Sequence, residues 1–343
     1  MIVNFISGKD LGGSKQSFVL YSKALSKIHS PIFSVIRKGA LLKQVMIDQN
    51  INFIEINYFR SKLWPFKNLA VKKIKKHLGN LDAKIIFVHK TLDLPIVSAA
   101  LKNTKIIGVI HSFNASNIEY ADALIAVSEH VKSFLIKQNY NKPIYVIPNI
   151  TTMSSTSHSK TLPDVPVIGA MGVFRKTKGF HTLIKALFLL KKKRVKFKAI
   201  IAGKGNLYCY LKYLKWKYNL QDQLIISPWV QNNKRDNFLD SIDLYILPSK
   251  SETFGMVVIE AMAKKKIVIA TKCGGPENII TNNTDGYLVD KQNSLALANK
   301  LEELIKNPKV SQHISDKAYQ TVTNNYRMDN LITNLQNLIS AYL

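Results

Sequence analysis

The stretch of residues 244–263 constrains the fold of this chain more than any other. It begins with the apolar run Leu-Tyr-Ile-Leu, and Pro248 follows that run directly. A short apolar run that stops at a proline is typical of a buried strand. Helix-prone residues then extend from about residue 256 to residue 265. The sequence therefore predicts a strand, a short loop and a helix, which is the repeating unit of an α/β fold.

Two glutamates lie at different depths around the start of this helix. Glu252 falls in the loop, and Glu260 falls inside the helix. The N-terminus of a helix has free backbone N–H groups that favour a bound anion, whereas carboxylates accept hydrogen bonds from hydroxyl groups. A nucleotide sugar carries both phosphates and hydroxyls, so it is the ligand that this stretch predicts. The alternative is a capped amphipathic helix on any parallel sheet, without a ligand.

Several short motifs surround the two glutamates. Pro248-Ser249 precedes them, seven residues separate them, and Ala261-Met262-Ala263 follows. Gly274-Gly275-Pro276-Glu277 and Asp285-Gly286-Tyr287-Leu288-Val289 come farther along the chain. Together these motifs resemble the signature of the retaining glycosyltransferases of the GT-B type, specifically their large fourth sequence family, the group 1 glycosyltransferases. The resemblance implies an α/β fold of two Rossmann-like domains that face each other across a cleft.

The same resemblance implies an activity. A sugar would be transferred from a nucleotide-diphosphate sugar to an acceptor hydroxyl, with retention at the anomeric carbon. The expected acceptor is a lipid-linked or cell-surface glycan precursor. In this reaction Glu252 would hold sugar hydroxyls and support positive charge at the anomeric centre, and Glu260 would bind the ribose diol, as an acid does in dinucleotide sites.

The loop Gly172-Val-Phe-Arg-Lys-Thr-Lys-Gly179 resembles the family's glycine-to-lysine-glycine loop, in which basic residues hold the donor diphosphate. Lys178 matches the lysine of that motif. Val173 stands where the family usually has an arginine, and we expect Arg175 to replace it because its planar fork can bind phosphate. Cations and a helix dipole can neutralise a diphosphate without a metal, so we expect neither a metal nor another cofactor. The other expected donor-binding residues are Gly13, Gly203, Phe254, Gly255, Met256 and Val257.

Two histidines in the first half of the chain directly follow expected strands. His89 comes after residues 84–88, and His111 comes after residues 106–110. In open α/β sheets, residues just past the carboxyl ends of strands line the ligand crevice. For His89 we favour a structural histidine whose ring is satisfied by nearby backbone. Residues 120–132 resemble the stretch that follows the family's active-site histidine, so we expect His111 to be catalytic together with Glu252.

The expected domain boundary lies after residue 150. Residues 151–160 are rich in Ser and Thr, and a new apolar strand begins near residue 167. We therefore predict an acceptor-binding domain at 1–150, a linker at 151–164 and a donor-binding domain at 165–325. By the resemblance, a final helix at 326–343 crosses back to the first domain. Residues 122–128 and 243–249 share Asp, Ile and Ser at the same offsets, which fits two similarly built halves.

The net charge of +27 indicates an anionic partner, which can be a nucleic acid, a membrane surface or a substrate. No nucleic-acid recognition motif is present, so we expect no specific nucleic acid. Residues 57–78 interleave aromatic and basic residues and then continue as a basic helix, a pattern that suits an anionic membrane surface. The alternative is a solvated helix face. The residues expected at the membrane are Tyr58, Arg60, Lys62, Trp64, Phe66, Lys67, Lys72, Lys73, Lys75 and Lys76.

The expected location is the cytoplasm, at the inner face of the membrane. No apolar segment approaches the roughly 20 residues of a membrane span, and the N-terminus reads as a first strand rather than a signal peptide. Cys209 and Cys273 are isolated, as in proteins of a reducing compartment. Two other functions compete with glycosyl transfer: a non-catalytic basic protein that binds membrane or nucleic acid, and a phosphorylase-like or synthase-like enzyme. The first leaves the paired acids unexplained, because carboxylates repel phosphate unless hydroxyls are presented to them.

Overall fold

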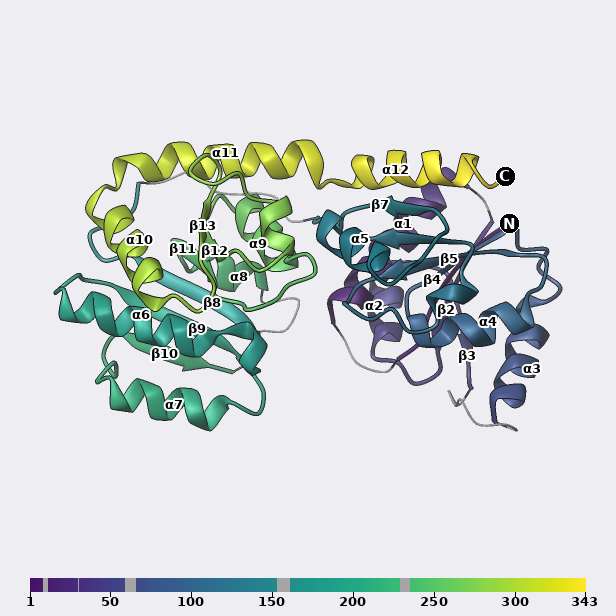
Figure 1. Ribbon diagram of the computed structural model, residues 1–343, viewed down its shortest axis with the longest axis horizontal. Helices are drawn as coiled ribbons and strands as arrows, with labels where there is room; N and C mark the ends of the chain where they lie inside the picture. Colours follow the sequence, from purple (N-terminus) through teal and green to yellow (C-terminus); the bar gives the residue numbers. More distant parts are fainter. Residues whose placement is uncertain (9–11, 30, 59–65, 153–160, 229–234) are drawn as a thin grey trace. The chain divides into compact units, whose positions relative to one another are not determined.

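The computed structural model describes residues 1–8, 12–29, 31–58, 66–152, 161–228 and 235–343, without the side chains of residues 66, 310 and 311. The chain forms two compact units (Figure 1). Unit 1 comprises Met1–Ile150 and Met328–Leu343, and unit 2 comprises Thr151–Arg327. The first segment of unit 1 ends at Ile150, and the chain continues directly into unit 2. None of the helices in the described ranges is long and apolar enough to cross a membrane.

Unit 1 is built on a parallel seven-stranded sheet in the order β3-β2-β1-β4-β5-β6-β7. The order reverses between β1 and β4, where an open α/β sheet forms its ligand crevice. The strands are β1 Ile2–Ile6, β2 Ile32–Arg37, β3 Phe53–Ile56, β4 Ile85–Val88, β5 Lys105–Ile110, β6 Ala123–Ala126 and β7 Ile144–Val146. The helices are α1 Gly13–Ile28, α2 Leu42–Asp48, α3 Phe66–Leu78, α4 Leu94–Ala100, α5 Glu129–Ile136 and α12 Met328–Ser340, with the short η1 Thr91–Asp93 and η2 Ile118–Tyr120.

The C-terminal helix α12 belongs to unit 1, which also holds the N-terminus. Leu331, Leu335 and Leu338 are buried, and their spacing of four and three residues places them on one face of α12. This face packs with α1 and the central strands in a single hydrophobic core (Figure 1). The chain thus returns to its first unit after completing the second.

Unit 2 has a parallel six-stranded sheet in the order β10-β9-β8-β11-β12-β13, with its order reversal between β8 and β11. The strands are β8 Val167–Val173, β9 Lys198–Lys204, β10 Leu224–Ser227, β11 Leu244–Leu247, β12 Ile267–Thr271 and β13 Tyr287–Val289. The helices are α6 Phe180–Lys192, α7 Tyr208–Lys217, α8 Arg235–Asp240, α9 Met256–Ala263, α10 Ser294–Lys306 and α11 Lys309–Asn325, with the short η3 Lys176–Lys178 and η5 Gly275–Asn278. α6 and α10 pack against each other over one face of this sheet.

The aspartate of the repeated segment, at residues 122–128 and 243–249, makes the same kind of hydrogen bond in both units. Asp122 directly precedes β6, and its carboxylate accepts a hydrogen bond from the backbone N–H of Ile106 at 2.8 Å. Asp243 directly precedes β11, and its carboxylate accepts a hydrogen bond from the backbone N–H of Val167, also at 2.8 Å. Each aspartate thereby ties the start of its strand to the start of the neighbouring strand. The pattern shared by residues 122–128 and 243–249 therefore corresponds to the same strand-to-strand connection in both sheets.

Candidate active site

Two loops of unit 2 meet where the strand order reverses. One loop follows β8 and the other follows β11, and because these parallel strands are neighbours both loops leave the same edge of the sheet. The backbone N–H of Lys250 donates to the carbonyl of Thr177 at 2.7 Å, which joins the loops. Gly179 has a φ of +65°, and a Cβ there would lie 1.8 Å from the carbonyl oxygen of Pro248. Only glycine allows this approach, so the loop positions are fixed by the backbone.

The expected phosphate-binding lysine and the expected catalytic acid are in direct contact. Lys178 Nζ lies 2.5 Å from Glu252 Oε1, and Ser249 Oγ donates to the same oxygen at 2.8 Å. Backbone hydrogen bonds hold Glu252 on both sides, since its N–H donates to Cys273 and its carbonyl accepts from Gly275. A phosphate bound by Lys178 would therefore lie beside the Glu252 carboxylate.

The Gly-Gly-Pro-Glu motif closes this site from a third side. A Cβ at Gly275 would lie 2.2 Å from the carbonyl oxygen of Phe254, so the loop can approach only as glycine. The ring of Phe254 is buried and lies edge-on to Tyr326 at 5.9 Å between centroids. This ring supports the loop from inside and does not present a face to a ligand.

Helix α9 begins at the same place and brings in the second acid. Gly255 caps it with a φ of +106°, and the first-turn amides of Met256 and Val257 have no partner one turn earlier in the helix. Glu260 is one turn further on and has no exposed surface. Its two carboxylate oxygens lie 3.1 and 3.4 Å from Nη1 of Arg235, which is the first residue of α8. Sequence reasoning missed Arg235, for which the only signal was that a buried acid requires a cation.

Three further residues near the expected phosphate site have two different surroundings. Arg175 and Lys176 are both exposed, and neither has an ion pair in the part of the chain that the structure describes. Gly203 is packed instead of open, since a Cβ there would lie 2.0 Å from the carbonyl oxygen of Gly172 and 2.5 Å from the ring of Phe174. The packing of β8 against β9 is sufficient reason for a glycine at position 203.

In unit 1, the two histidines that follow strands stack on each other. His89 Nδ1 lies 2.9 Å from His111 Nε2, and the rings are 5.2 Å apart at 16°. His89 Nε2 lies 2.9 Å from Asn4 Oδ1, while the amide nitrogen of Asn4 donates to Phe18 and Ser22. The expectation of backbone partners for the ring of His89 is wrong: side chains hold it from both sides.

This chain of hydrogen bonds defines where the protons lie. Asn4 Oδ1 only accepts, so His89 Nε2 carries a proton and its Nδ1 accepts from Nε2–H of His111. Burial lowers the pKa of His89 well below its usual range, with His111, Lys15 and Lys90 adding to the effect. Burial, with a smaller contribution from Lys90, lowers the pKa of His111 to about 3. Both rings are neutral at pH 7, and Nδ1 of His111 is a hydrogen-bond acceptor.

Comparison with known proteins identifies the chain. The family model for glycosyl transferases group 1 matches residues 155–321, and the model for Glycosyltransferase Family 4 matches residues 32–152. The chain belongs to the group 1 glycosyltransferases. The resemblance drawn from the motifs around Glu252 and Glu260 is thereby confirmed.

Relatives of this glycosyltransferase match it over nearly its whole length. The lipopolysaccharide core biosynthesis glycosyltransferase LpsE of Rhizobium meliloti is 22% identical over 339 residues, which are 95% of this chain and 94% of LpsE. A glycosyltransferase structure from Rickettsia africae has a TM-score of 0.84 at 22% identity and covers 99% of this chain and 98% of its own. Anabaena HepE, solved with UDP and glucose, has a TM-score of 0.82 at 17% identity and covers 99% of this chain and all of its own. The structural likeness confirms the GT-B fold.

The glycine-rich start of α1 in this glycosyltransferase lies next to a buried polar cluster. Gly13 is exposed and is the first residue of α1, whereas Lys15 is almost fully buried and donates to the carbonyls of Ser7 and Gly8. Asp93 is fully buried and accepts from Ser7 and from the hydroxyl of Tyr58, the latter at 3.0 Å. The prediction that Tyr58 meets a membrane is wrong, because its side chain is committed to this cluster.

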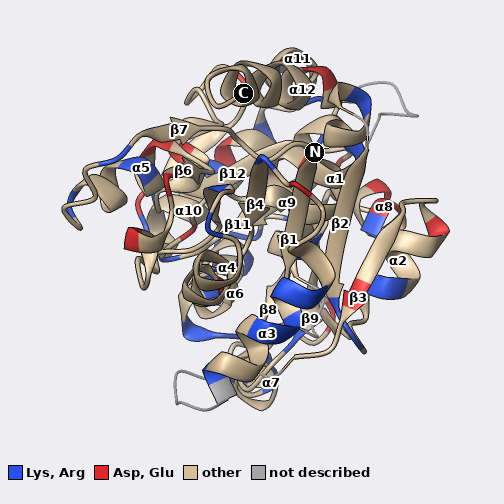
Figure 2. Cartoon of the chain, turned by 90° about the vertical axis from the view of Figure 1, so that its right-hand side faces the viewer, with Lys and Arg blue, Asp and Glu red and all other residues tan. Residues whose placement is uncertain are grey.

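The rest of the predicted membrane segment has a mixed outcome. Arg60, Lys62 and Trp64 lie outside the described residues, as does the side chain of Phe66. Lys67 is half-buried in the first turn of α3. Figure 2 shows α3 with Lys and Arg in blue, and the exposed lysines on this helix are Lys72, Lys73, Lys75 and Lys76. α3 is therefore a basic helix, as expected, without a described aromatic side chain at its surface.

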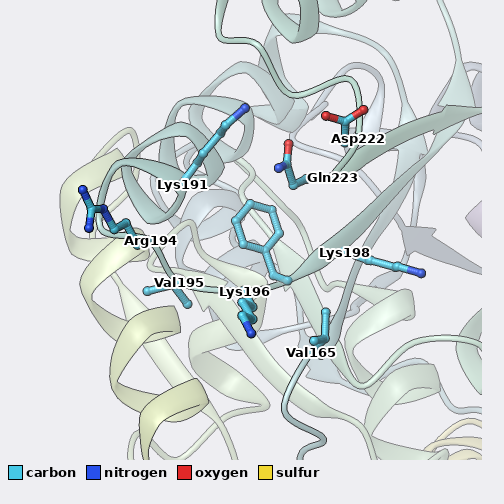
Figure 3. A pocket seen from close by; sticks show the side chains of 9 residues that line it. Val165, Lys191, Arg194, Val195, Lys196, Lys198, Asp222 and Gln223 are labelled. Carbon is cyan, nitrogen blue, oxygen red and sulfur yellow. The ribbon is translucent and has the colours of Figure 1, made fainter.

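A separate hollow of about 380 Å³ lies at the opposite edge of the unit 2 sheet (Figure 3). It is lined by residues at the end of α6 and at the starts of β8, β9 and β10, so it is remote from the carboxyl ends where Lys178 and Glu252 meet. Its basic side chains do not converge, because those of Arg194 and Lys198 point away from each other. This divergence is unlike a site that converges on one anion. Within the described ranges, no group of three or more His, Cys, Asp or Glu side chains is placed to hold a metal ion.

Proposed function

We propose that this glycosyltransferase takes its sugar from a nucleotide-diphosphate sugar and transfers it with retention to a hydroxyl of a lipid-linked or cell-surface glycan precursor. The contact of Lys178 with Glu252, at 2.5 Å beside the start of α9, carries the proposal. In this proposal Lys178 is the cation for the diphosphate, the adjacent Glu252 is the acid for the sugar, and Glu260, one turn into α9, binds the ribose diol. LpsE acts in lipopolysaccharide core biosynthesis, and HepE was solved with UDP and glucose, which supports the same substrate class.

In the proposed reaction, different groups of the protein stabilise the two charges that develop during sugar transfer. The bond between the anomeric carbon and a diphosphate oxygen breaks, and the acceptor oxygen forms the new bond on the same face while its hydroxyl proton is released. Negative charge grows on the departing diphosphate, where Lys178, the amides of Met256 and Val257, and Arg175 would stabilise it. Positive character grows at the anomeric carbon, where the Glu252 carboxylate would stabilise it. We propose that these groups make a metal unnecessary.

His111 has a distinct role in this proposal. Its neutral ring presents Nδ1 as an acceptor, because the bond to His89 holds the proton on Nε2. An acceptor of this kind suits a sugar or acceptor hydroxyl. We also propose that the exposed lysines of α3 bring unit 1 to an anionic membrane surface, where each contributes about 1 kcal/mol.

A panel of nucleoside diphosphates and their sugars tests the donor assignment. A ligand at 100 times its dissociation constant stabilises the protein by about 2.7 kcal/mol, which a thermal unfolding shift detects. Glu260→Ala should abolish the shift from the cognate nucleotide, and Lys178→Ala should weaken it. Lys176→Ala is the matched control, because it removes the same charge from the same loop and should leave the shift unchanged.

Product analysis separates the competing functions. Release of nucleoside diphosphate with formation of a glycoside supports glycosyl transfer. A requirement for inorganic phosphate would instead favour a phosphorylase, and membrane or nucleic-acid binding without response to any nucleotide sugar would favour a non-catalytic protein. Either of these results would overturn the proposal.

A further inference from the structure

Helix α7 carries most of the exposed aromatic side chains in the described part of the protein. Tyr208, Tyr210, Tyr213 and Trp216 are 38%, 46%, 49% and 67% exposed. Among the described residues, Tyr120 is the only other aromatic side chain of comparable exposure. Single exposed apolar residues are ordinary, but four exposed aromatic rings on one ten-residue helix are a concentration of the kind that marks an interaction site.

The orientation of α7 explains why these rings face outward. Leu211 and Leu214 are buried in the core of unit 2 and define the inner face of the helix. Cys209, Tyr213 and Trp216 follow one another at spacings of four and three, so they form a stripe on the opposite face. The rings of Tyr213 and Trp216 are 6.2 Å apart between centroids. Figure 1 shows α7 at the outside of unit 2.

The charged side chains of this segment are all positive. Lys212 and Lys217 are exposed beside the aromatic rings, and Lys204 is exposed just before the helix. The ammonium of Lys212 lies 5.6 Å from the ring centre of Tyr208. Residues 203–221 contain neither Asp nor Glu, so no acid within this segment offsets the lysines. We call the exposed side chains of α7 the aromatic–lysine face.

We propose that the aromatic–lysine face docks unit 2 on an anionic lipid bilayer. Tyr and Trp combine an apolar ring with a polar tip and favour the headgroup region, while lysine stems lie along apolar surface and their ammonium groups meet anionic headgroups. A convex helix face suits a flat bilayer, whereas single-stranded nucleic acid is bound in basic grooves. The surface is independent of α3 and of the donor assignment, so it stands or falls separately from the proposed function.

Vesicle flotation of the full chain tests the docking. We expect binding to vesicles of phosphatidylcholine with phosphatidylglycerol, and little binding to phosphatidylcholine alone. Lys212→Gln with Lys217→Gln should lower partitioning by about fivefold per lysine. Tyr213→Ser with Trp216→Ser should also lower it, because the rings are lost while the charge is kept.

A control pair elsewhere on unit 2 shows whether the location matters. Leu295 is 55% exposed and Lys291 is exposed nearby on the chain, so Leu295→Ser with Lys291→Gln removes an exposed apolar side chain and a charge away from α7. This variant should bind vesicles as the parent does. Thermal unfolding of every variant shows that the fold is retained.

The cysteines provide a local readout. Cys209 is exposed on the proposed contact face, whereas Cys273 is buried and burial raises the pKa of its thiol to about 11, which slows its reaction. A polarity-sensitive dye attached at Cys209 should shift its emission to the blue with anionic vesicles and not with neutral ones.

Four outcomes would overturn the proposal. The α7 variants could bind vesicles as tightly as the parent, or the dye at Cys209 could stay in water while the protein is bound. The parent could bind a single-stranded oligonucleotide more tightly than vesicles through the same side chains. It could also self-associate through α7 without lipid, which size-exclusion chromatography of the parent and of the Trp216→Ser variant would reveal.

Discussion

Lowering the pH from 7.5 to 5.5 should destabilise unit 1, and the stacked pair of His89 and His111 is the reason. Burial lowers the pKa of both imidazoles, so both stay neutral in the folded unit at pH 5.5. In the unfolded chain each has an ordinary pKa of about 6.5 and takes up a proton. The unfolded state therefore binds more protons, and stability present above pH 6.5 is lost as the pH falls towards the folded-state pKa of His111 at about 3.

The loss of stability depends on the difference between the pH and the pKa of histidine in the unfolded chain. At pH 5.5, one unit below that value, a histidine that stays neutral in the folded state costs about 1.4 kcal/mol. His111 contributes this amount and His89 about as much again, so the pair costs about 3 kcal/mol. This is a large part of the 5–15 kcal/mol or so that stabilises a typical domain.

Hydrogen exchange measured by mass spectrometry reports each unit separately. The opening free energy of the slowest amides in β1, β4 and β5 should fall by about 3 kcal/mol between pH 7.5 and pH 5.5, after correction for intrinsic exchange. His111→Gln should halve the fall, whereas His130→Gln, which removes an exposed histidine of unit 1, should not change it. Equal opening free energies at the two pH values, or an unchanged fall in His111→Gln, would refute the assignment of buried neutral histidines.

Five further substitutions test unit 2. Arg175→Ala should cost about 1.5–3 kcal/mol in kcat/KM if its guanidinium replaces the missing loop arginine, and Lys176→Ala should cost almost nothing; equal small losses would leave Lys178 as the only phosphate ligand of the loop. Arg235→Met should lower the unfolding free energy by about 3 kcal/mol, since it leaves a buried carboxylate unpaired, and adding Glu260→Leu should restore stability in urea unfolding without restoring nucleotide binding. Gly179→Ala should cost about 2–4 kcal/mol by the same measurement, because both its φ and its approach to a carbonyl exclude a Cβ; a loss below 1 kcal/mol, on the order of an ordinary surface change, would contradict this.

Local sequence signals were sufficient to predict the strand and the helix that position the site. The apolar run before Pro248 is β11, and the helix expected from residue 256 is α9. A strand end and a helix start are defined by neighbours in the chain, so the depth order of Glu252 and Glu260 follows from spacing alone. The same holds for His111, which follows β5 directly.

Contacts between segments that are distant in the sequence could not be predicted from local signals. Asn4 holds His89 from 85 positions away, and no property of residues 84–89 identifies that partner. Tyr58 was read as an interfacial aromatic because basic residues follow it, but the fold turns its ring inward and its hydroxyl to Asp93. Local amphipathicity does not distinguish a side chain that meets lipid from one that meets a buried carboxylate.

Helix α7 is another segment whose orientation the periodicity of the sequence does not indicate. Its tyrosines and tryptophan count as apolar residues, so the segment offers no clear polar face from which to infer an orientation. In the structure two leucines are the buried residues of the helix, and the aromatic rings lie outside. The sequence predicted an aromatic and basic surface at residues 57–78, and of the Phe, Tyr and Trp side chains in that stretch the structure describes only Tyr58, which is buried.

The anomeric configuration of the product tests the central claim most directly. The parent enzyme should convert an α-linked nucleotide-diphosphate sugar into an α-glycoside, which the coupling constant of the anomeric proton in the NMR spectrum reports at early reaction times. Glu252→Gln should form the same α-product with a much lower kcat and a similar KM for the donor, because the carboxylate acts on the charge of the transition state. A β-glycoside from the parent, or an unchanged kcat in Glu252→Gln, would contradict a retaining transfer centred on Glu252 and Lys178.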